Sequence, residues 1–270
     1  MQTRLVLVAG LGLFACAPMA GAAFVDNFES YTAGTFPSAN WLDFRTLIPS
    51  PTSQNSSGSV VSLAGPNGST TKAFRTRRAV GTSQGIYARF APTRFVSISA
   101  DVRFEAWDNS TNMNGGGWPM ALGFFNASPG FDPNFAPQTM IVADSTNKTW
   151  AIYTQTGQAF STAQFWNLNA TPVLNTWYRL SLNLDTVTGQ VSAQVRLSAT
   201  NALITSAAFA IPNWDPASAA YNVGGALDGE YGTNATLGGQ AVVDNINLVP
   251  APGAAVIVLG ALCARRRTRV

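Results

Sequence analysis

Apolar and polar residues alternate along much of the chain, which is the pattern of half-buried β-strands. The longest run, 96–106, places apolar residues at the even positions, with Asp101, Arg103 and Glu105 among the odd ones. No segment of the central body keeps helical spacing over three turns. The pattern therefore predicts an all-β body.

A hairpin is predicted where two alternating runs, 180–185 and 190–197, flank the glycine-containing turn 186–189. Weaker strands are expected at 72–80, 85–91, 119–126, 139–143, 149–154, 203–211 and 240–248. Segments 50–71 and 108–117 are polar and rich in Gly, Asn and Ser, so we expect long surface loops there. About ten short strands, each with one polar face, predict a sandwich of two packed antiparallel sheets.

The N-terminus differs from this body and has the order of a secretory signal peptide. Residues 1–4 carry one positive charge, 5–15 are apolar, and small residues lead to Ala23, where signal peptidase is expected to cut. An apolar run of about eleven residues is too short to span a bilayer. A lipoprotein signal that ends in Cys16 is the alternative.

Charge belongs largely to the two ends. The chain has 16 basic and 13 acidic residues, a net charge of +3. Five arginines lie outside residues 24–249, which leaves 11 basic against 13 acidic residues there, a net of −2. The basic excess therefore gives no support to nucleic-acid binding, which needs a basic face on the folded domain.

The residue types that are missing exclude several kinds of chemistry. The chain has no histidine, and its two cysteines, Cys16 and Cys263, both lie in the ends. Catalysis by Ser-His-Asp or Cys-His, histidine metal ligands and a disulfide within the body are therefore excluded. Carboxylates remain the candidates for catalysis.

The clustered carboxylates Asp101, Glu105 and Asp108 do not match a glycosidase pair. On one strand, Asp101 and Glu105 share a face with Cα atoms about 13–14 Å apart. Retaining glycosidases need carboxyl groups about 5–5.5 Å apart, and inverting enzymes need about 6.5–9.5 Å, which this backbone spacing reaches only if both side chains lean together. We therefore predict no catalytic residue.

Three stretches resemble the concanavalin A-like, laminin-G-like jelly rolls of bacterial secreted proteins. They are 24–31 (Phe-Val-Asp-Asn-Phe-Glu-Ser-Tyr), 175–185 with the following glycine turn, and 242–248 (Val-Val-Asp-Asn-Ile-Asn-Leu). The resemblance implies that they are the first strand, the central hairpin and the closing strand of such a fold. It implies no single activity, because these domains include sugar binders, adhesion modules and glycosidases. The Glu-x-Asp-x-(x)-Glu run of jelly-roll laminarinases and agarases is missing here.

The C-terminus resembles a PEP-CTERM sorting signal. Its parts are Pro250-Ala251-Pro252, the apolar segment 253–264, and Arg265, Arg266 and Arg267. The resemblance implies processing by an exosortase-type enzyme after transient anchoring in the inner membrane, although Ala251 stands where the motif has glutamate. Twelve helical residues cover about 18 Å of a hydrocarbon core of about 30 Å. Arginines after an apolar segment stay cytoplasmic, which places the body outside; an uncut C-terminal anchor is the alternative.

Ligand sites are predicted at four tryptophans and at one pair of aspartates. Trp107, Trp118, Trp166 and Trp214 have loop-like neighbours and are candidates to stack on sugar rings, with core filling or loop anchoring as the alternative for each. The resemblance also implies that the first and last strands pair, which would bring Asp26 near Asp244. Calcium prefers such hard oxygen ligands, whereas hydrogen bonding at the strand ends is the alternative.

Three parts are therefore predicted: a signal peptide (1–23), a β-sandwich domain (24–249) and a sorting signal (250–270). We expect a non-enzymatic protein that is exported to the cell envelope or the extracellular matrix and that has a polysaccharide-binding or structural role. A jelly-roll glycoside hydrolase or lyase that acts on extracellular glycans is the alternative. The identity of the ligand, the cleavage of the tail and the oligomeric state stay open.

Overall fold

The computed structural model describes residues 24–43, 58–76, 84–89, 93–107, 118–126, 137–157, 163–216, 223–229 and 239–251, and each regular element within these ranges is a β-strand. Within the same ranges, no helix has the length and hydropathy that a membrane crossing needs. The signal peptide, the loop 108–117 and the sorting residues Pro252, Arg265, Arg266 and Arg267 lie outside the described residues.

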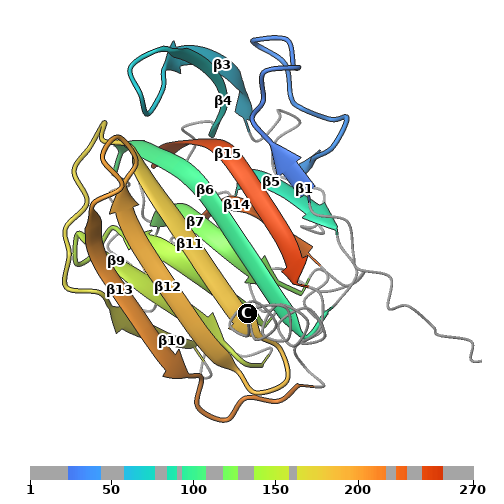
Figure 1. Ribbon diagram of the computed structural model, residues 1–270, viewed down its shortest axis with the longest axis vertical. Helices are drawn as coiled ribbons and strands as arrows, with labels where there is room; N and C mark the ends of the chain where they lie inside the picture. Colours follow the sequence, from blue (N-terminus) through green and yellow to red (C-terminus); the bar gives the residue numbers. More distant parts are fainter. Residues whose placement is uncertain are drawn as a thin grey trace, which may run out of the picture.

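Two antiparallel sheets form a sandwich (Figure 1). Sheet A contains, in order, β13 (Leu203–Ala210), β12 (Gln190–Leu197), β11 (Tyr178–Asp185), β6 (Phe95–Ala106), β15 (Gln240–Ala251), β4 (Thr70–Thr76) and β3 (Gly58–Ala64), with β1 (Phe24–Asp26) also paired to β15. Sheet B contains, in order, β10 (Ala163–Asn167), β9 (Thr149–Gln155), β8 (Gln138–Asp144), β7 (Trp118–Phe125), β14 (Val223–Gly229), β5 (Gln84–Arg89) and β2 (Leu42–Asp43).

The space between the sheets is filled by one hydrophobic core to which both sheets contribute. Trp150 of β9 lies across this core with its ring centroid 6.0 Å from Phe104 of β6 and 5.3 Å from Tyr178 of β11. Both pairs meet edge to face, which is the favourable geometry for aromatic rings. The even-numbered apolar residues of 96–106 supply much of the sheet A side, so the predicted inward face of this strand is confirmed.

The strong alternating runs are confirmed. β11 and β12 form the predicted hairpin. The whole length of β11 pairs with residues 95–102 of β6. Of the weaker strands, those at 119–126, 139–143, 149–154, 203–211 and 240–248 are found within two or three residues of their predicted ends. Residues 77–80 and 90–91 of the first two lie outside the described residues.

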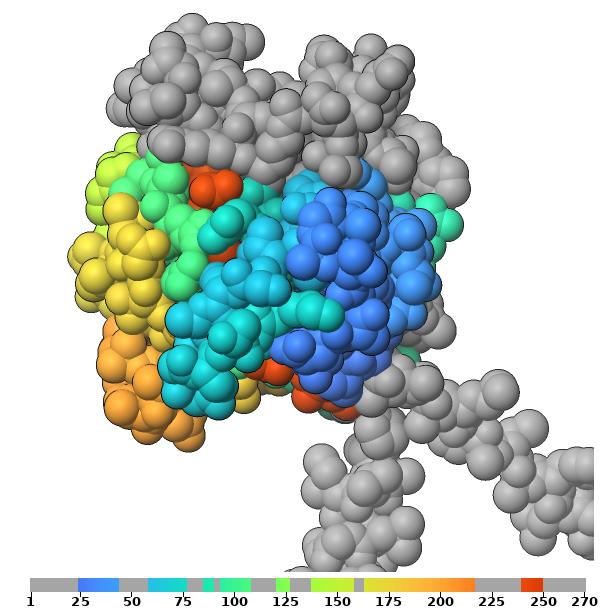
Figure 2. Space-filling view, turned by 90° about the horizontal axis from the view of Figure 1, so that it is seen from above, coloured from blue at the N-terminus to red at the C-terminus, as the bar shows by residue number. Residues whose placement is uncertain are grey.

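The prediction of a loop over 50–71 is wrong for its second half. Residues 58–64 form β3, which pairs antiparallel with β4 from Gly58↔Thr76 to Ala64↔Thr70. Val60 also exchanges backbone hydrogen bonds with the β1–β2 segment, to Thr35 O at 2.9 Å and from Gly34 N at 2.8 Å. Figure 2 shows the blue and cyan segments, residues 24–43 and 58–76, lying together at this end of the molecule. The abundant Ser and Gly hid this strand, because β3 is an edge strand with little apolar area to bury.

The closing strand β15 contains a bulge that decides which side chains face out. Asp244 pairs with Asp101 and Asn247 pairs with Ser99, so three steps on β15 match two on β6. Asn245 takes up the extra residue in a left-handed conformation (φ 50°), which asparagine tolerates better than most residues. β15 then continues through Pro250 to Ala251, two residues past the predicted end of the domain.

Candidate functional site

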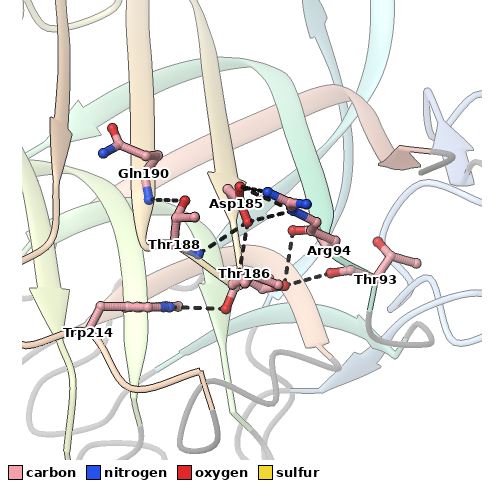
Figure 3. A network of polar contacts seen from close by, with 8 residues as sticks. Thr93, Arg94, Asp185, Thr186, Thr188, Gln190 and Trp214 are labelled. Carbon is pink, nitrogen blue, oxygen red and sulfur yellow. Dashed lines mark hydrogen bonds and ion pairs between the residues drawn. The ribbon is translucent and has the colours of Figure 1, made fainter. Parts of the chain in front are cut away.

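Trp214 is a structural residue of the β11–β12 turn. Its indole nitrogen donates to the carbonyl oxygen of Thr186 at 3.0 Å (Figure 3). The ring also covers Gly189, where an added Cβ would lie 2.5 Å from Cγ of Trp214. Gly189 has a φ of 68°, so both the space and the backbone conformation favour glycine there.

The same turn is held by Asp185, which is paired with Arg94 at 3.1 Å (Figure 3). Asp185 also accepts hydrogen bonds from the backbone nitrogens of Val187 (2.9 Å) and Thr188 (3.3 Å). Burial alone would raise the pKa of Asp185, but Arg94 and the turn donors outweigh it and lower this pKa. Trp214 and Asp185 therefore hold the turn at the end of the hairpin. Trp214 thus anchors a loop, as the alternative to sugar stacking expected.

The other predicted tryptophans do not gather at one site. The ring of Trp166 packs on Phe209 with a centroid distance of 4.3 Å, which joins β10 to β13 at one edge of the sandwich. The ring of Trp107 lies 4.7 Å from Phe104, and Lys148 Nζ lies 4.4 Å from the Trp107 ring centroid. Trp118 begins β7, and its side chain is outside the described part of the structure.

Asp26 and Asp244 are not brought together. Strand β1 does pair with β15 as the resemblance implied, but Asp26 is opposite Ile246, a core residue, and not opposite Asp244. Asp26 faces the core, where its carboxylate accepts hydrogen bonds from Phe28 N (2.8 Å), Tyr31 Oη (2.7 Å) and Trp41 Nε1 (2.8 Å). Asp244 faces outward beside Asp101. Because the sheet lies between the two carboxylates, they do not converge on one calcium ion. Among the described residues, no three acidic side chains lie close enough together to hold a metal ion.

Asp101 and Asp244 instead form a buried pair on the outer face of sheet A, and they are 1% and 0% exposed. The negative charge of Asp101 is well compensated by hydrogen-bond donors. Its carboxylate accepts from Arg179 Nε (2.9 Å), from the Arg179 Nη2, from Ser198 Oγ (2.8 Å) and from Asn245 Nδ2 (2.9 Å). The hydrogen bond to Asp101 raises the pKa of Arg179 further above its ordinary value.

Asp244 has fewer donors. It accepts from the backbone nitrogen of Asn245 at 2.7 Å and from the hydroxyl of Thr71 at 3.0 Å. The Thr71 hydroxyl also lies 2.8 Å from Glu29 Oε1, and it has only one proton to donate. The pKa of Asp244 is raised to about 6, mainly because the carboxyl group is buried. The hydrogen bonds from Asn245 and Thr71 lower this pKa by less than burial raises it, and the charges of Asp101 and Glu29 also raise it.

Next to this pair, the outer face of sheet A becomes neutral over four strands. We define the neutral face as the outward positions of β6, β11, β12 and β13 that lie in two rows across the sheet. Their residues are Ser99, Ser181, Gln194 and Ser206 in one row and Ser97, Asn183, Ser192 and Ala208 in the other. Asn183, Gln194, Ser206 and Ala208 are exposed, and the others are half-buried.

The neutral face has free hydrogen-bonding capacity. Asn183 Nδ2 donates to Ser192 Oγ at 3.1 Å, and Gln194 Oε1 accepts from Arg196 Nε at 3.1 Å. The hydroxyls of Ser97, Ser99, Ser181 and Ser206 have no hydrogen-bond partner among the residues that the structure describes. They are therefore open to water or to a ligand.

On the outer face of sheet B, by contrast, several side chains are buried and not exposed to solvent. Tyr87, Phe125, Met140 and Tyr153 belong to a second buried apolar cluster on the side away from the main core. The Tyr153 hydroxyl donates to Gln155 Oε1 at 2.6 Å, and burial raises the pKa of Tyr153 above its ordinary value. Gln155 is 0% exposed. A ligand therefore does not reach these aromatic and amide groups in this arrangement.

Sequence reasoning selected tryptophans and missed the neutral face. Its signal was present, because the odd positions of 96–100 and 179–184 and the even positions of 190–196 are nearly all Ser, Asn or Gln. Those residues were interpreted only as the solvent side of each strand. Strand register is needed to show that they adjoin across the sheet.

The sequence matches no family model and no curated protein. The fold is similar to several solved structures. A sialidase matches with a TM-score of 0.51 and 12% identity over 87% of this chain, although the match covers only 19% of the sialidase. The cellulose-induced protein Cip1 matches with a TM-score of 0.50, 13% identity, 84% of this chain and 97% of its own. The lectin UEA-II, complexed with galactose, matches with a TM-score of 0.51 and 10% identity, and the match covers 85% of this chain and 98% of the lectin. At such identities the likeness shows the fold alone, and it agrees with the antiparallel β-sandwich that the sequence predicted.

Proposed function

We propose that this chain is an exported, non-enzymatic protein that binds polysaccharide through the neutral face of sheet A. The observation that carries the proposal is the set of unpartnered hydroxyls, with amides among them, at adjoining outward positions of four strands. Sugars present hydroxyls that both donate and accept hydrogen bonds, and serine, asparagine and glutamine match them without charge. The lectin-like fold supports the proposal only as an analogy.

A non-enzymatic role is supported by the surroundings of the carboxylates. Asp101 and Asp244 are the adjoining acidic pair on this face, yet four hydrogen bonds already occupy Asp101. Asp244 is fully buried, so it is out of reach of a glycosidic bond. General acid catalysis requires a carboxyl group within hydrogen-bond reach of the leaving oxygen.

Export and sorting remain part of the proposal, because the sequence signals for them lie in the ends of the chain. Signal peptidase and an exosortase-type enzyme would act at residues 23 and 250–252, and the body would then belong to the cell envelope or the matrix. Intact-mass analysis of protein from the native host tests this part. An N-terminus near Phe24 with no free thiol supports it, and a lipid-modified Cys16 as the first residue contradicts it.

Affinity electrophoresis in gels that contain soluble neutral or acidic polysaccharides, together with sedimentation with insoluble ones, tests binding. A reducing-sugar assay on the same panel tests catalysis. Retardation or sedimentation without release of reducing ends supports the proposal. Release of reducing ends would favour the glycoside hydrolase alternative, and no interaction with any polysaccharide would refute both.

A further inference from the structure

We infer that the neutral face binds packed chains of an uncharged polysaccharide in preference to a single soluble chain. This inference rests on the proposed function and specifies its ligand class. Four observations support it: the short side chains of the face, the register of its two rows, its charged boundaries and the absence of an aromatic ring.

The neutral face is flat, because its side chains are short. Its longest side chain is Gln194, and the other seven of its eight positions are serine or alanine, or an asparagine bonded to serine. Within the two rows, the short side chains therefore form no wall that would enclose one sugar chain; the longer side chains of Arg179 and Arg196 stand in the adjoining row. Figure 1 shows β6, β11, β12 and β13 side by side as the front layer.

The two rows run across the strands and are in register. Neighbouring strands are about 4.8 Å apart, and alternate residues on a strand are about 6.8 Å apart. The face therefore spans about 14 Å from β6 to β13 and offers two parallel lines of hydrogen-bonding groups. Asn247 of β15 extends the first row beyond Ser99, and its buried amide oxygen accepts no hydrogen bond from any residue that the structure describes.

Charged residues lie at the two ends of the neutral face, and one of them, Arg196, reaches its edge by donating to Gln194 Oε1 at 3.1 Å. At one end the next row contains Asp101, Arg179 and Arg196. At the other end Asp185 pairs with Arg94 at 3.1 Å. The charges of Asp101 and Asp185 are thus compensated within the protein, and none of the eight central residues can neutralise a carboxylate or sulfate. An uncharged ligand fits this distribution best.

The energetics favour a ligand that is already ordered. A hydrogen bond contributes only about 0.5–1.5 kcal/mol net, because it replaces a bond to water. Association costs an estimated 4–15 kcal/mol in translational and rotational freedom whichever form of the sugar is bound, and a soluble chain also loses internal freedom. No ring in the neutral face can stack on a sugar to offset these costs. Chains in a packed solid have already lost that freedom, and they present several contacts at fixed spacing.

The test compares packed and soluble forms of the same sugars with the full chain. The packed probes are microcrystalline cellulose and chitin, and the soluble probes are their hexasaccharides. We expect apparent binding to cellulose or chitin at least about tenfold tighter, per sugar chain at the surface, than to the matching hexasaccharide. Equal or tighter binding of a hexasaccharide would overturn the inference and leave the proposed function intact.

Two variants localise the effect. Ser181→Lys and Gln194→Lys each place a charge in the middle of the first row, and each should weaken sedimentation with the solid at least about tenfold because the ammonium must be desolvated. Ser38→Lys, an exposed position outside the face, is the matched control and should bind like the wild type. Melting temperatures of the Gln194→Lys and Ser38→Lys variants should be unchanged, because both residues are exposed. Ser181 is half-buried, so the melting curve of Ser181→Lys shows whether this variant is folded before its binding is compared. Wild-type binding by both face variants, or no binding of the wild type to any of the four probes, would refute the inference; the wider polysaccharide panel decides the proposed function separately.

Discussion

Two buried aspartates on opposite faces of sheet A have very different surroundings. Asp26, on the core side, accepts three hydrogen bonds from neutral donors, namely a backbone nitrogen, a phenol and an indole. Asp244, on the outer side, accepts one backbone hydrogen bond and shares the single proton of Thr71 with Glu29. The first carboxylate joins the chain between β1 and β2 to the sandwich, whereas the second lies beside another carboxylate, Asp101.

The difference shows that burial alone does not make a carboxylate a site. Where donors compensate the charge, as at Asp26, the group is structural. Where they compensate it only in part, as at Asp244, the folded state holds a proton more tightly than the unfolded state does.

The largest effect is expected from Asp26→Ala. The substitution leaves Trp41 Nε1, the Tyr31 hydroxyl and Phe28 N without their acceptor, and Trp41 and Phe28 are buried. Each buried donor left unsatisfied costs about 1–3 kcal/mol, so we expect a loss of about 3–5 kcal/mol in the free energy of unfolding. Chemical denaturation measures it, with Asn27→Ala, an exposed neighbour, as the control. A loss below about 1 kcal/mol would contradict the structural role of Asp26.

Asp101→Asn should have the next largest effect. The amide group of asparagine has only one oxygen to accept the hydrogen bonds that two carboxylate oxygens accept now. Arg179 is half-exposed and can return to water, so we expect a loss of about 2 kcal/mol, less than at Asp26. A loss as large as that of Asp26→Ala would show that the outer pair is no less important for stability than the inner group.

Asp244→Asn should stabilise the protein, and only at neutral and higher pH. The pKa of Asp244 in the folded state, about 6, lies above its ordinary value of 3.8. The folded state therefore binds this proton more tightly, and the stability that the proton contributes is complete below pH 3.8 and is lost as the pH rises through about 6. Asparagine has no charge to bury, so we expect a gain of about 1–2 kcal/mol at pH 8 and no gain near pH 4.

Melting curves of the wild type and of Asp244→Asn between pH 4 and pH 8 measure this gain. The difference in melting temperature should grow with pH and level off above about pH 7. A constant difference over the whole range would mean that Asp244 does not titrate in this interval. The control is Asp26→Asn, which should destabilise at both ends of the range.

The sequence predicted the strands better than the sites, and the reason is physical. Alternation reports which residues of one strand share a face, so β6, β11 and β12 could be located from 96–106, 180–185 and 190–197. β3, β10 and β14 (Val223–Gly229) were not predicted, because 58–64, 163–167 and 223–229 show no clear alternation of apolar and polar residues.

The site residues depended on register, which the sequence does not contain. Pairing of β1 with β15 could be expected, but the bulge at Asn245 decides whether Asp244 faces Asp26 or Asp101. One extra residue reverses the facing of every side chain beyond it. In the same way, each serine of the neutral face looks like an ordinary solvent-facing residue until four strands are placed side by side.

The smallest effect is expected from Glu29→Gln, and it shows what sets the pKa of Asp244. The amide keeps an acceptor for the backbone nitrogen of Lys72, now 2.9 Å from Glu29 Oε1, but removes a negative charge. The Thr71 hydroxyl then has one carboxylate instead of two and can donate fully to Asp244. Both changes favour the ionised form, so the pH at which the wild type loses stability, about 6, should move downward in this variant. Titration of the Asp244 carboxyl carbon by NMR measures the shift directly, and an unchanged or higher midpoint would show that Glu29 does not contribute to raising this pKa.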